Sequence, residues 1–189
     1  MTKPVLWIPR KLSAATEARA ARDYDVRLNP DDRLYTPDEI IAMSQEVDAI
    51  LPCHSEHFSV DVVAVMSNRV KIIANHSVGV DHCDLEALKA KGIVVTNTPD
   101  VLSDATAEIA LLLMLGAARR ASEGDQLVRS GNWVSWSPSF MVGTQMTGKR
   151  LGIVGMGRVG RAFAKLVSGF GMEIHYYNRS RLAEDQEAG

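Results

Sequence analysis

The sequence has 189 residues, of which 46% are hydrophobic and 23% charged, with a formal net charge of −2; this composition supports a buried core and excludes a disordered chain. The charges form no run of one sign, so neither nucleic acid nor a membrane surface is an expected partner. With two cysteines, no signal-like segment and no stretch near the ~18 apolar residues of a membrane span, the expected location is the cytoplasm.

Through the first hundred residues, short β-branched runs alternate with helix-forming segments. This alternation predicts a parallel sheet with helices on both faces, here a complete flavodoxin-like unit. Thr36-Pro37-Asp38-Glu39 predicts a capped helix start, because it combines a hydroxyl cap, an early proline and acids near the positive end of the helix dipole. The expected strands are residues 5–8, 25–28, 49–51, 71–75 and 93–96, and the expected helices are residues 13–22, a helix from 36 onward, 60–66 and 85–91.

After Pro99 the pattern changes, and we place a first domain at residues 1–102 and a second at 103–189. Ser103 precedes a helix expected over residues 104–120. The apolar residues of this segment leave little polar face, so we expect the helix to be buried between layers. A further helix is expected over residues 122–130, ended by Gly131.

Residues 132–147 show no clear period but contain four large apolar side chains, Trp133, Trp136, Phe140 and Met141. A long loop of this composition is uncommon on the surface of a monomer, because such side chains need covering. The segment therefore favours a subunit interface; the alternative is packing within the chain itself.

The segment Gly155-Met-Gly157-Arg-Val-Gly160 is the strongest functional signal. It follows a strand expected at residues 151–154 and opens a helix expected to run to about Phe170, before a strand at 173–177. In this context a GxGxxG turn binds the pyrophosphate of a dinucleotide. The first glycine permits the tight turn, the second lets the main chain approach the phosphates, and the third allows close helix–strand packing, while the helix N-terminus offers free N–H groups. The alternative is a glycine turn in an ordinary α/β domain.

The residues after the second strand of this motif bear on the choice of cofactor. NAD-binding proteins carry an acid about 20 residues after the turn, where it bonds the ribose 2′-hydroxyl. This sequence has Asn178, Arg179 and Ser180 there, followed by Arg181. A guanidinium can pair with a 2′-phosphate that a carboxylate would repel, so NADP is the expected cofactor. NAD stays open if the arginines are ordinary surface charges.

Three linked segments resemble the D-isomer-specific 2-hydroxyacid dehydrogenases: residues 75–99, residues 104–108 (Asp-Ala-Thr-Ala-Glu) and the glycine turn. The resemblance is strongest to the glyoxylate/hydroxypyruvate reductase branch, where Asn-Thr-Pro and Asn-Arg-Ser are also found. It implies a flavodoxin-like substrate-binding domain, the N-terminal portion of an NAD(P)-binding Rossmann domain, and hydride transfer between NAD(P)H and a small 2-keto or 2-hydroxy acid. Asp100 stands where this branch often has Gly, and we expect it to alter a hinge turn.

The resemblance also implies roles for single residues and assembly as a homodimer. The expected dimerisation arm is residues 121–147. Backbone N–H groups of the turn at residues 78–79 are expected to hold the substrate carboxylate. The positions that match the family's substrate site are Leu51, Val78 and Gly79. The positions that match its cofactor site outside the glycines are Thr106, Arg158 and Val159.

The family's catalytic Arg, Glu and His follow later strands of the cofactor domain, so we expect no catalytic residue within this chain. A protein ending at Gly189 is expected to aggregate or to be molten, without turnover, because two strands and one crossover helix leave an apolar face and an open strand edge. Two alternatives remain open: a non-catalytic, dinucleotide-sensing binding protein of the same family, and a truncated, inactive product.

The remaining histidines are interpreted as structural. Residues 53–57 (Cys-His-Ser-Glu-His) have no second paired set at zinc spacing, so we interpret them as a loop and expect no metal. His76 and His82 flank the turn at residues 78–79 and are expected to shape it. His175 lies within a predicted strand and is expected to be a packed core residue.

Overall fold

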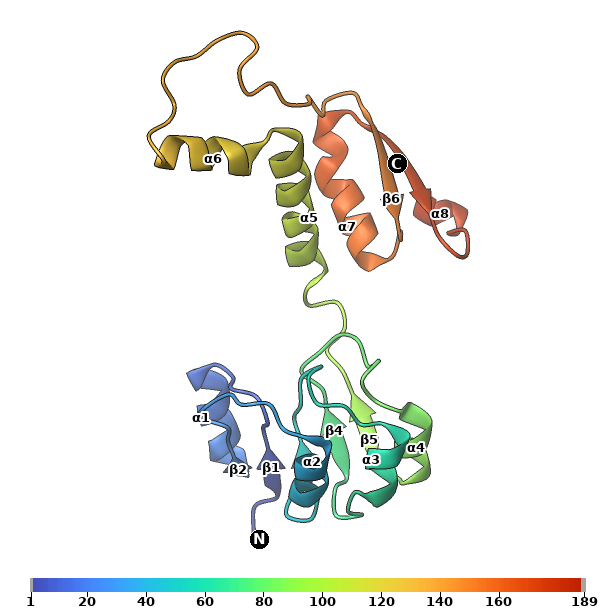
Figure 1. Ribbon diagram of the computed structural model, residues 1–189. Coiled ribbons are helices and arrows are strands. Elements are labelled where there is room, and N and C mark those ends of the chain that lie inside the picture. The colour runs from blue at the N-terminus through green and yellow to red at the C-terminus, as the bar shows by residue number, and fades with distance from the viewer. Residues whose placement is uncertain (1, 188–189) are drawn as a thin grey trace. The chain divides into compact units, whose positions relative to one another are not determined.

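The computed structural model describes residues 2–187, which form two packing units divided after Pro99 (Figure 1). The first unit contains a five-stranded parallel sheet with the strand order β2-β1-β3-β4-β5. This is the order of a flavodoxin-like fold, so the predicted fold class is confirmed. The strands are β1 (Val5–Trp7), β2 (Asp25–Arg27), β3 (Ala49–Ile50), β4 (Ile72–Ala74) and β5 (Val94–Thr96); the helices are α1 (Ala14–Asp23), α2 (Pro37–Ser44), α3 (Val60–Val65) and α4 (Leu85–Ala90).

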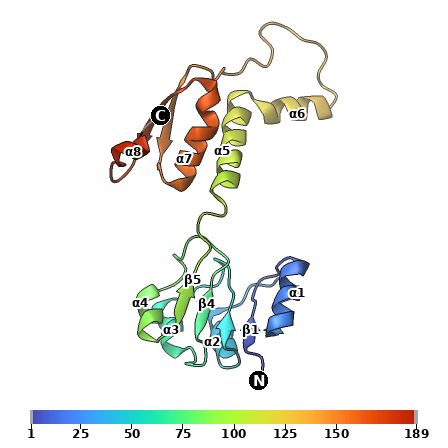
Figure 2. The ribbon, with the colours of Figure 1, turned by 180° about the vertical axis from the view of Figure 1, so that it is seen from behind.

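Helices cover both faces of this sheet, as the alternating pattern predicted (Figure 2). Successive side chains of a strand point to opposite faces. Trp7 and Ile50 therefore lie in the larger core with side chains of α2, α3 and α4, whereas Leu6 and Ile8 pack with α1 on the other face. Full burial of one such aliphatic side chain stabilises the fold by roughly 1.5–3 kcal/mol.

Side-chain caps explain where the helices of this unit begin. At α2 the Thr36 hydroxyl accepts the N–H of Glu39, and the Glu39 carboxylate accepts the N–H of Thr36 at 2.8 Å. This reciprocal pair, with Pro37 in the first turn, confirms the predicted helix start. Ser13 caps α1 and Asp84 caps α4 more simply, because each side chain accepts one backbone N–H of the first turn. A cap of this kind contributes about 1 kcal/mol.

The second unit is built around a two-stranded parallel sheet and the helix that connects its strands. In the sheet, Leu151 pairs with Ile174 and Val154 pairs with Tyr177. The connecting helix α7 packs on the sheet face that carries Ile153, and α5 packs against α7. The elements are α5 (Ser103–Ala118), α6 (Ala121–Arg129), β6 (Arg150–Val154), α7 (Arg158–Val167), a 3₁₀ turn (Ser168–Phe170), β7 (Glu173–Tyr177) and α8 (Glu184–Glu187).

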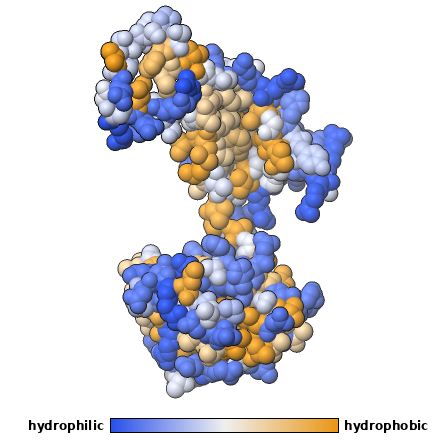
Figure 3. All heavy atoms as spheres, viewed as in Figure 1, coloured by the Kyte–Doolittle hydropathy of each residue, from blue (hydrophilic) through white to orange (hydrophobic). Residues whose placement is uncertain are grey.

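The prediction that the long helix α5 is buried between layers is wrong for the described residues. Only Ala107 is buried, whereas the side chains of Ile109 and Leu112 are 54% and 63% exposed. Hydrophobic residues accordingly appear on the surface around this helix in Figure 3. The helix is apolar nearly all round, and α7 covers one side of it, so the other side stays exposed.

The ends of α5 also differ from the prediction. The helix begins at Ser103 itself, and its cap position, Leu102, makes no side-chain hydrogen bond. It ends at Ala118, two residues before the predicted end, because Arg120 adopts a left-handed conformation with φ 55°. Ser103 is therefore a first-turn residue and not the residue before the helix.

The segment that follows α6 forms a loop with exposed apolar side chains. Trp133 is 55% exposed and Trp136 is 74% exposed. The loop is attached to α5 at one point, where the N–H of Thr144 donates to the carbonyl of Ala118 at 2.7 Å. Gly143 allows this approach, since a Cβ there would lie 2.6 Å from the same carbonyl oxygen. Across residues 2–187, no helix has the length and apolar character needed to cross a membrane.

Candidate functional site: the glycine turn and the loop after β4

The turn after β6 has separate geometric requirements at its first and third glycines. Gly155 has φ +100°, a conformation that side chains rarely adopt. Gly160 faces it, and a Cβ on Gly160 would lie 2.3 Å from the carbonyl oxygen of Gly155. Gly157 differs from both, because no atom lies within 4 Å of the position its Cβ would take. The turn itself thus requires glycine at 155 and 160, whereas open space adjoins Gly157.

The open space lies beside unpaired backbone donors. Gly157 is the cap position of α7, and the helix has no side-chain cap. The first intrahelical bond runs from the N–H of Arg161 to the carbonyl of Gly157 at 2.9 Å. The N–H groups of Arg158, Val159 and Gly160 therefore have no acceptor in the helix. Unpaired N–H groups at the positive end of a helix dipole, with space before them, suit a diphosphate group.

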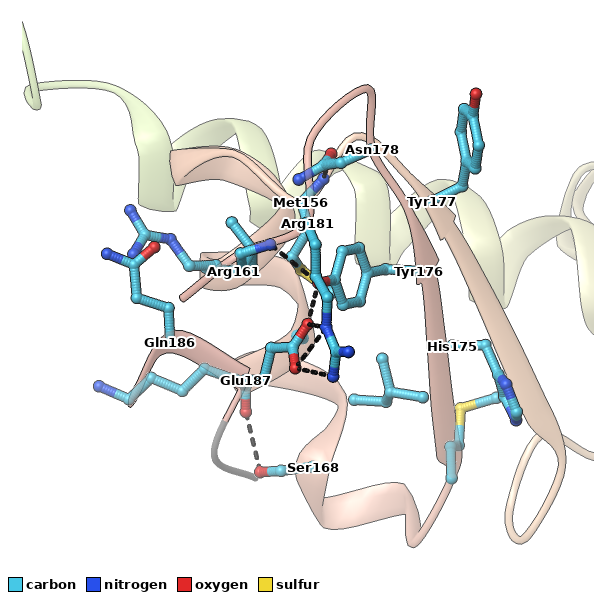
Figure 4. A pocket seen from close by; sticks show the side chains of 15 residues that line it. Met156, Arg161, Ser168, His175, Tyr176, Tyr177, Asn178, Arg181, Gln186 and Glu187 are labelled. Carbon is cyan, nitrogen blue, oxygen red and sulfur yellow. Dashed lines mark hydrogen bonds and ion pairs between the residues drawn. The ribbon is translucent and has the colours of Figure 1, made fainter. Parts of the chain in front are cut away.

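Asn178 braces this turn from the end of β7. Its side-chain oxygen accepts the N–H of Met156 at 2.7 Å (Figure 4). The N–H of Gly155 donates to the carbonyl of Tyr177 at 2.9 Å, so two bonds join the turn to the second strand. The amide nitrogen of Asn178 has no acceptor among the described residues.

The two arginines after β7 differ in their partners. Arg181 forms an ion pair with Glu187 at 2.7 Å, and Arg181 together with the Tyr176 hydroxyl lowers the pKa of Glu187 to about 2. Arg179 is exposed and has no ion-pair partner within residues 2–187. A cavity of about 970 Å³ lies beside this segment, lined by Asn178 and Arg181 among others (Figure 4). Of the two guanidinium groups, the one on Arg179 is therefore available for an anion.

The residue after Pro99 contacts the glycine turn. Asp100 has φ +64°, in the left-handed region that favours glycine. Its carboxylate accepts from the Arg158 guanidinium at 2.7 Å, with both side chains more than half exposed. A further predicted residue, Thr106, lies in the first turn of α5, where its hydroxyl donates to the carbonyl of Leu102 at 2.9 Å.

In the first unit, the loop after β4 has carbonyl groups that accept hydrogen bonds from side chains, whereas two of its backbone N–H groups are unpaired among the described residues. The Asn97 side chain donates to the carbonyl of Val78 at 2.8 Å, and the Ser77 hydroxyl donates to the carbonyl of Gly79 at 2.7 Å. The N–H groups of Val78 and Gly79 have no acceptor within the described part of the chain. This loop lies at the carboxyl edge of a parallel sheet, where ligands bind in such folds. No role for Asn97 was expected from the sequence, although its position directly after β5 places it at this edge.

The segment that follows β3 reaches the same edge of the sheet. Leu51 is partly buried, and its N–H donates to the carbonyl of Trp7 at 2.8 Å. Beyond it, the Glu56 carboxylate is buried and accepts the N–H of Cys53 at 2.9 Å and the hydroxyl of Ser55 at 2.8 Å. These bonds hold the 53–57 segment as a loop. Among residues 2–187, no group of three or more potential ligands is arranged to hold a metal ion.

The expectation that His175 is a packed core residue is wrong. Its side chain is 58% exposed and pairs with Glu173 at 2.8 Å. His175 alternates along β7 with Ile174 and Tyr176, so it lies on the sheet face opposite α7. No helix covers that face among the described residues.

The geometry defines a class of protein before any comparison. A parallel strand–turn–helix–strand unit with free amides at the helix start is a dinucleotide-binding fold, here preceded by a flavodoxin-like unit.

Comparisons with known proteins show which family the chain resembles. Residues 111–189 match the NAD binding domain of the D-isomer specific 2-hydroxyacid dehydrogenases. The chain is 42% identical over 188 residues to a glycerate dehydrogenase from Hyphomicrobium methylovorum, covering 100% of this chain and 58% of that protein. It is 38% identical over 186 residues to a glyoxylate reductase from Pyrococcus horikoshii, covering 96% of this chain and 55% of the relative.

A solved structure agrees with these relatives. The NADPH-dependent glyoxylate/hydroxypyruvate reductase from Sinorhizobium meliloti, in complex with NADP and malonate, matches with a TM-score of 0.76 and 27% identity, covering 97% of this chain and 56% of that one. These matches support the resemblance to the D-isomer-specific 2-hydroxyacid dehydrogenase family, in its glyoxylate reductase branch, that the motifs indicated. The chain spans little more than half the length of these relatives.

Proposed function

We propose that the whole protein transfers a hydride between NAD(P)H and a small 2-keto or 2-hydroxy acid, as a glyoxylate or hydroxypyruvate reductase does. The observation that carries this proposal is the set of free N–H groups at Arg158, Val159 and Gly160, behind the open space at Gly157. These groups would hold the cofactor's diphosphate. When bound, the nicotinamide cofactor supplies the hydride, and the names of the relatives supply the substrate class.

The substrate's carboxylate is proposed to bind the N–H groups of Val78 and Gly79. The Val78 N–H shares a peptide plane with the Ser77 carbonyl, which accepts the N–H of Thr98 at 2.9 Å. The Gly79 N–H shares one with the Val78 carbonyl, which accepts from Asn97, so both planes are fixed with their N–H groups unpaired within residues 2–187. Two such donors suit an anionic group, as in other backbone anion sites. Leu51, at the end of the neighbouring strand β3, is proposed to line the same site.

NADP is proposed as the preferred cofactor. Arg179 supports this proposal because it is exposed and free of an ion pair among the described residues, whereas Glu187 neutralises Arg181. Ser180 offers a hydroxyl, and Asn178 offers its amide nitrogen, beside this guanidinium. A relative of known structure is described as NADPH-dependent and was solved with NADP. Thr106, in the first turn of α5, is proposed to contact the cofactor.

The arm of residues 121–147 is proposed to pair two copies of the protein as a homodimer. Its support is the exposed apolar surface that includes Trp133, Trp136 and Val142, which are 55%, 74% and 62% exposed. Apolar surface of this kind favours a protein interface. The catalytic Arg, Glu and His are proposed to belong to the part of the whole protein that corresponds to the unmatched length of the relatives.

The test is an assay of the intact protein with NADPH and NADH against a panel that includes glyoxylate and hydroxypyruvate. The expected result is oxidation of the reduced cofactor with one of these acids, with NADPH preferred. Cofactor binding without turnover on any 2-keto acid would support a dinucleotide-sensing binding protein instead. Binding of neither cofactor would overturn the proposal.

A further inference from the structure

Two buried polar side chains, Asn75 and His82, bracket the loop of residues 76–81. Asn75 is 3% exposed and His82 is 8% exposed, and the imidazole Nε2 lies 2.8 Å from the Asn75 Oδ1. The loop between them contains Val78 and Gly79. A buried polar group is costly unless it is hydrogen-bonded, so this contact is important to the stability of the loop.

The donors and acceptors of this pair are determined by a third residue. The Asn75 Nδ2 lies 3.1 Å from the carbonyl oxygen of Thr96, which can only accept a hydrogen bond. The Asn75 Oδ1 must therefore face His82, so the imidazole carries its proton on Nε2 and donates it. Burial, together with the nearby His57 and His54, lowers the pKa of His82, which keeps the ring neutral near pH 7.

The pair adds a side-chain link among three segments at this edge of the sheet. Asn75 follows β4, and Thr96 ends β5. His82 is fixed to the segment before α3, because its carbonyl accepts the N–H of Phe58 at 2.7 Å. The bond from His82 to Asn75 thus closes the loop against the carboxyl edge of the sheet. Without it, the His82 side chain has no hydrogen bond among the described contacts.

We propose that Asn75 and His82 are positioning residues, which hold the turn at Val78 and Gly79 in the conformation that presents both N–H groups to a carboxylate. This inference rests on the proposed function, because it assumes that the substrate binds at that turn. Neither side chain is proposed to touch the substrate. Their effect is exerted through the backbone of residues 76–81.

The test compares two substitutions of His82 in the intact protein. In His82→Gln the side-chain amide nitrogen can donate to Asn75 in place of Nε2, whereas His82→Met fills a similar volume without a donor. We expect His82→Met to raise KM for the 2-keto acid by about tenfold, the effect of one lost buried hydrogen bond, with kcat and the Kd for NADPH little changed. His82→Gln is expected to stay close to the unmodified protein.

A matched control separates positioning from general destabilisation. Asn29 is a buried asparagine whose side chain holds another loop through the carbonyls of Pro9 and Arg33, at 2.7 Å each. Asn29→Ala is expected to lower stability without raising KM. Should His82→Met fail to fold, Asn75→Ser breaks the same bond from the other side.

Hydrogen exchange gives a readout that does not depend on activity. Loss of the pair is expected to speed exchange at Thr98, whose N–H donates to Ser77, and at Cys83, whose N–H donates to Val80, with no change in β1. If the unmodified protein reduces no 2-keto acid, the proposed function fails, while faster exchange in His82→Met would still support the pair as the device that holds the loop. Unchanged KM and unchanged exchange in a folded His82→Met protein would overturn the positioning role.

Discussion

Replacing Gly160 by alanine should disrupt the glycine turn from inside the protein. The added Cβ would lie 2.3 Å from the carbonyl oxygen of Gly155 and 3.2 Å from its carbonyl carbon, and real Cβ contacts essentially never fall below 3.0 Å. The gap must therefore open by about 0.7 Å, and both neighbouring atoms belong to backbone, which cannot rotate away. Either α7 moves away from β6 or the turn at Gly155 changes shape.

Overpacking of this kind typically lowers the free energy of unfolding by about 1–3 kcal/mol, and we expect a loss in this range for Gly160→Ala. With an ordinary denaturant slope, a loss of about 2 kcal/mol lowers the urea midpoint by roughly 1 M. Two other glycines provide controls, since a Cβ at either Gly157 or Gly169 meets no atom within 4 Å. Gly157→Ala should leave stability nearly unchanged but weaken dinucleotide binding by about tenfold or more, because its methyl group occupies the space proposed for the phosphates. Gly169→Ala should change neither property.

The assay combines urea unfolding with fluorescence titration of NADPH on the intact protein. Gly160→Ala should lose both stability and affinity, Gly157→Ala affinity alone, and Gly169→Ala neither. Equal stability of Gly160→Ala and the unmodified protein would refute the close-packing argument. Equal NADPH affinity of Gly157→Ala would refute the assignment of the open space to the diphosphate.

Three further predictions follow from other parts of the structure. Asn178→Asp keeps an acceptor for the Met156 N–H but adds a charge that repels a 2′-phosphate, so the ratio of NADPH to NADH affinity should fall by about tenfold or more in paired titrations. Trp136→Ala removes an exposed arm side chain and should weaken self-association in analytical ultracentrifugation without lowering the free energy of unfolding. The Arg69 guanidinium, and then the Val5 N–H, lower the pKa of Asp48 in the folded protein. The ionised carboxylate therefore contributes stability that is fully present above its unfolded pKa of about 3.8 and is lost as the pH falls from there through the lower folded pKa. Asp48→Asn should be less stable at pH 7 and should lose less stability on acidification.

The first unit could be predicted almost completely from the sequence. Its strands are short β-branched runs between helix-forming segments, and parallel pairing follows from that alternation. The start of α2 at Thr36 was equally visible, because a capping box is a local pattern that needs no tertiary partner. The observed strands are a residue or more shorter than predicted. Lys71 and Asn75, for example, flank β4, although their N–H groups still donate to the carbonyls of Asp48 and Thr96.

The two wrong predictions of burial share a cause. Periodicity shows which side chains lie on one face, but it does not show which element covers that face. α5 is apolar nearly all round, so the sequence could not tell that α7 contacts one side and leaves Leu112 exposed. In β7, alternation placed His175 opposite Ile174, and the covered face happened to be that of Ile174.

The candidate site was predictable where the requirement is local. The left-handed φ of Gly155 and the crowding at Gly160 belong to one short segment, and the motif shows both. The side-chain hydrogen bonds that hold the two loops were not predictable, because they join residues far apart in the sequence. Asn178 and Met156 are 22 residues apart, and Asn97 and Val78 are 19 apart. Those contacts depend on strand order and loop course, which become known only with the fold.

The most direct measurement of the central claim is a crystal structure of the intact protein grown with NADPH. The expected result is density for the cofactor's diphosphate within hydrogen-bond distance of the N–H groups of Arg158 and Val159, with the 2′-phosphate beside Arg179. A diphosphate located elsewhere, or a protein that takes up neither NADPH nor NADH at saturating concentration, would contradict the assignment of the glycine turn as a dinucleotide site.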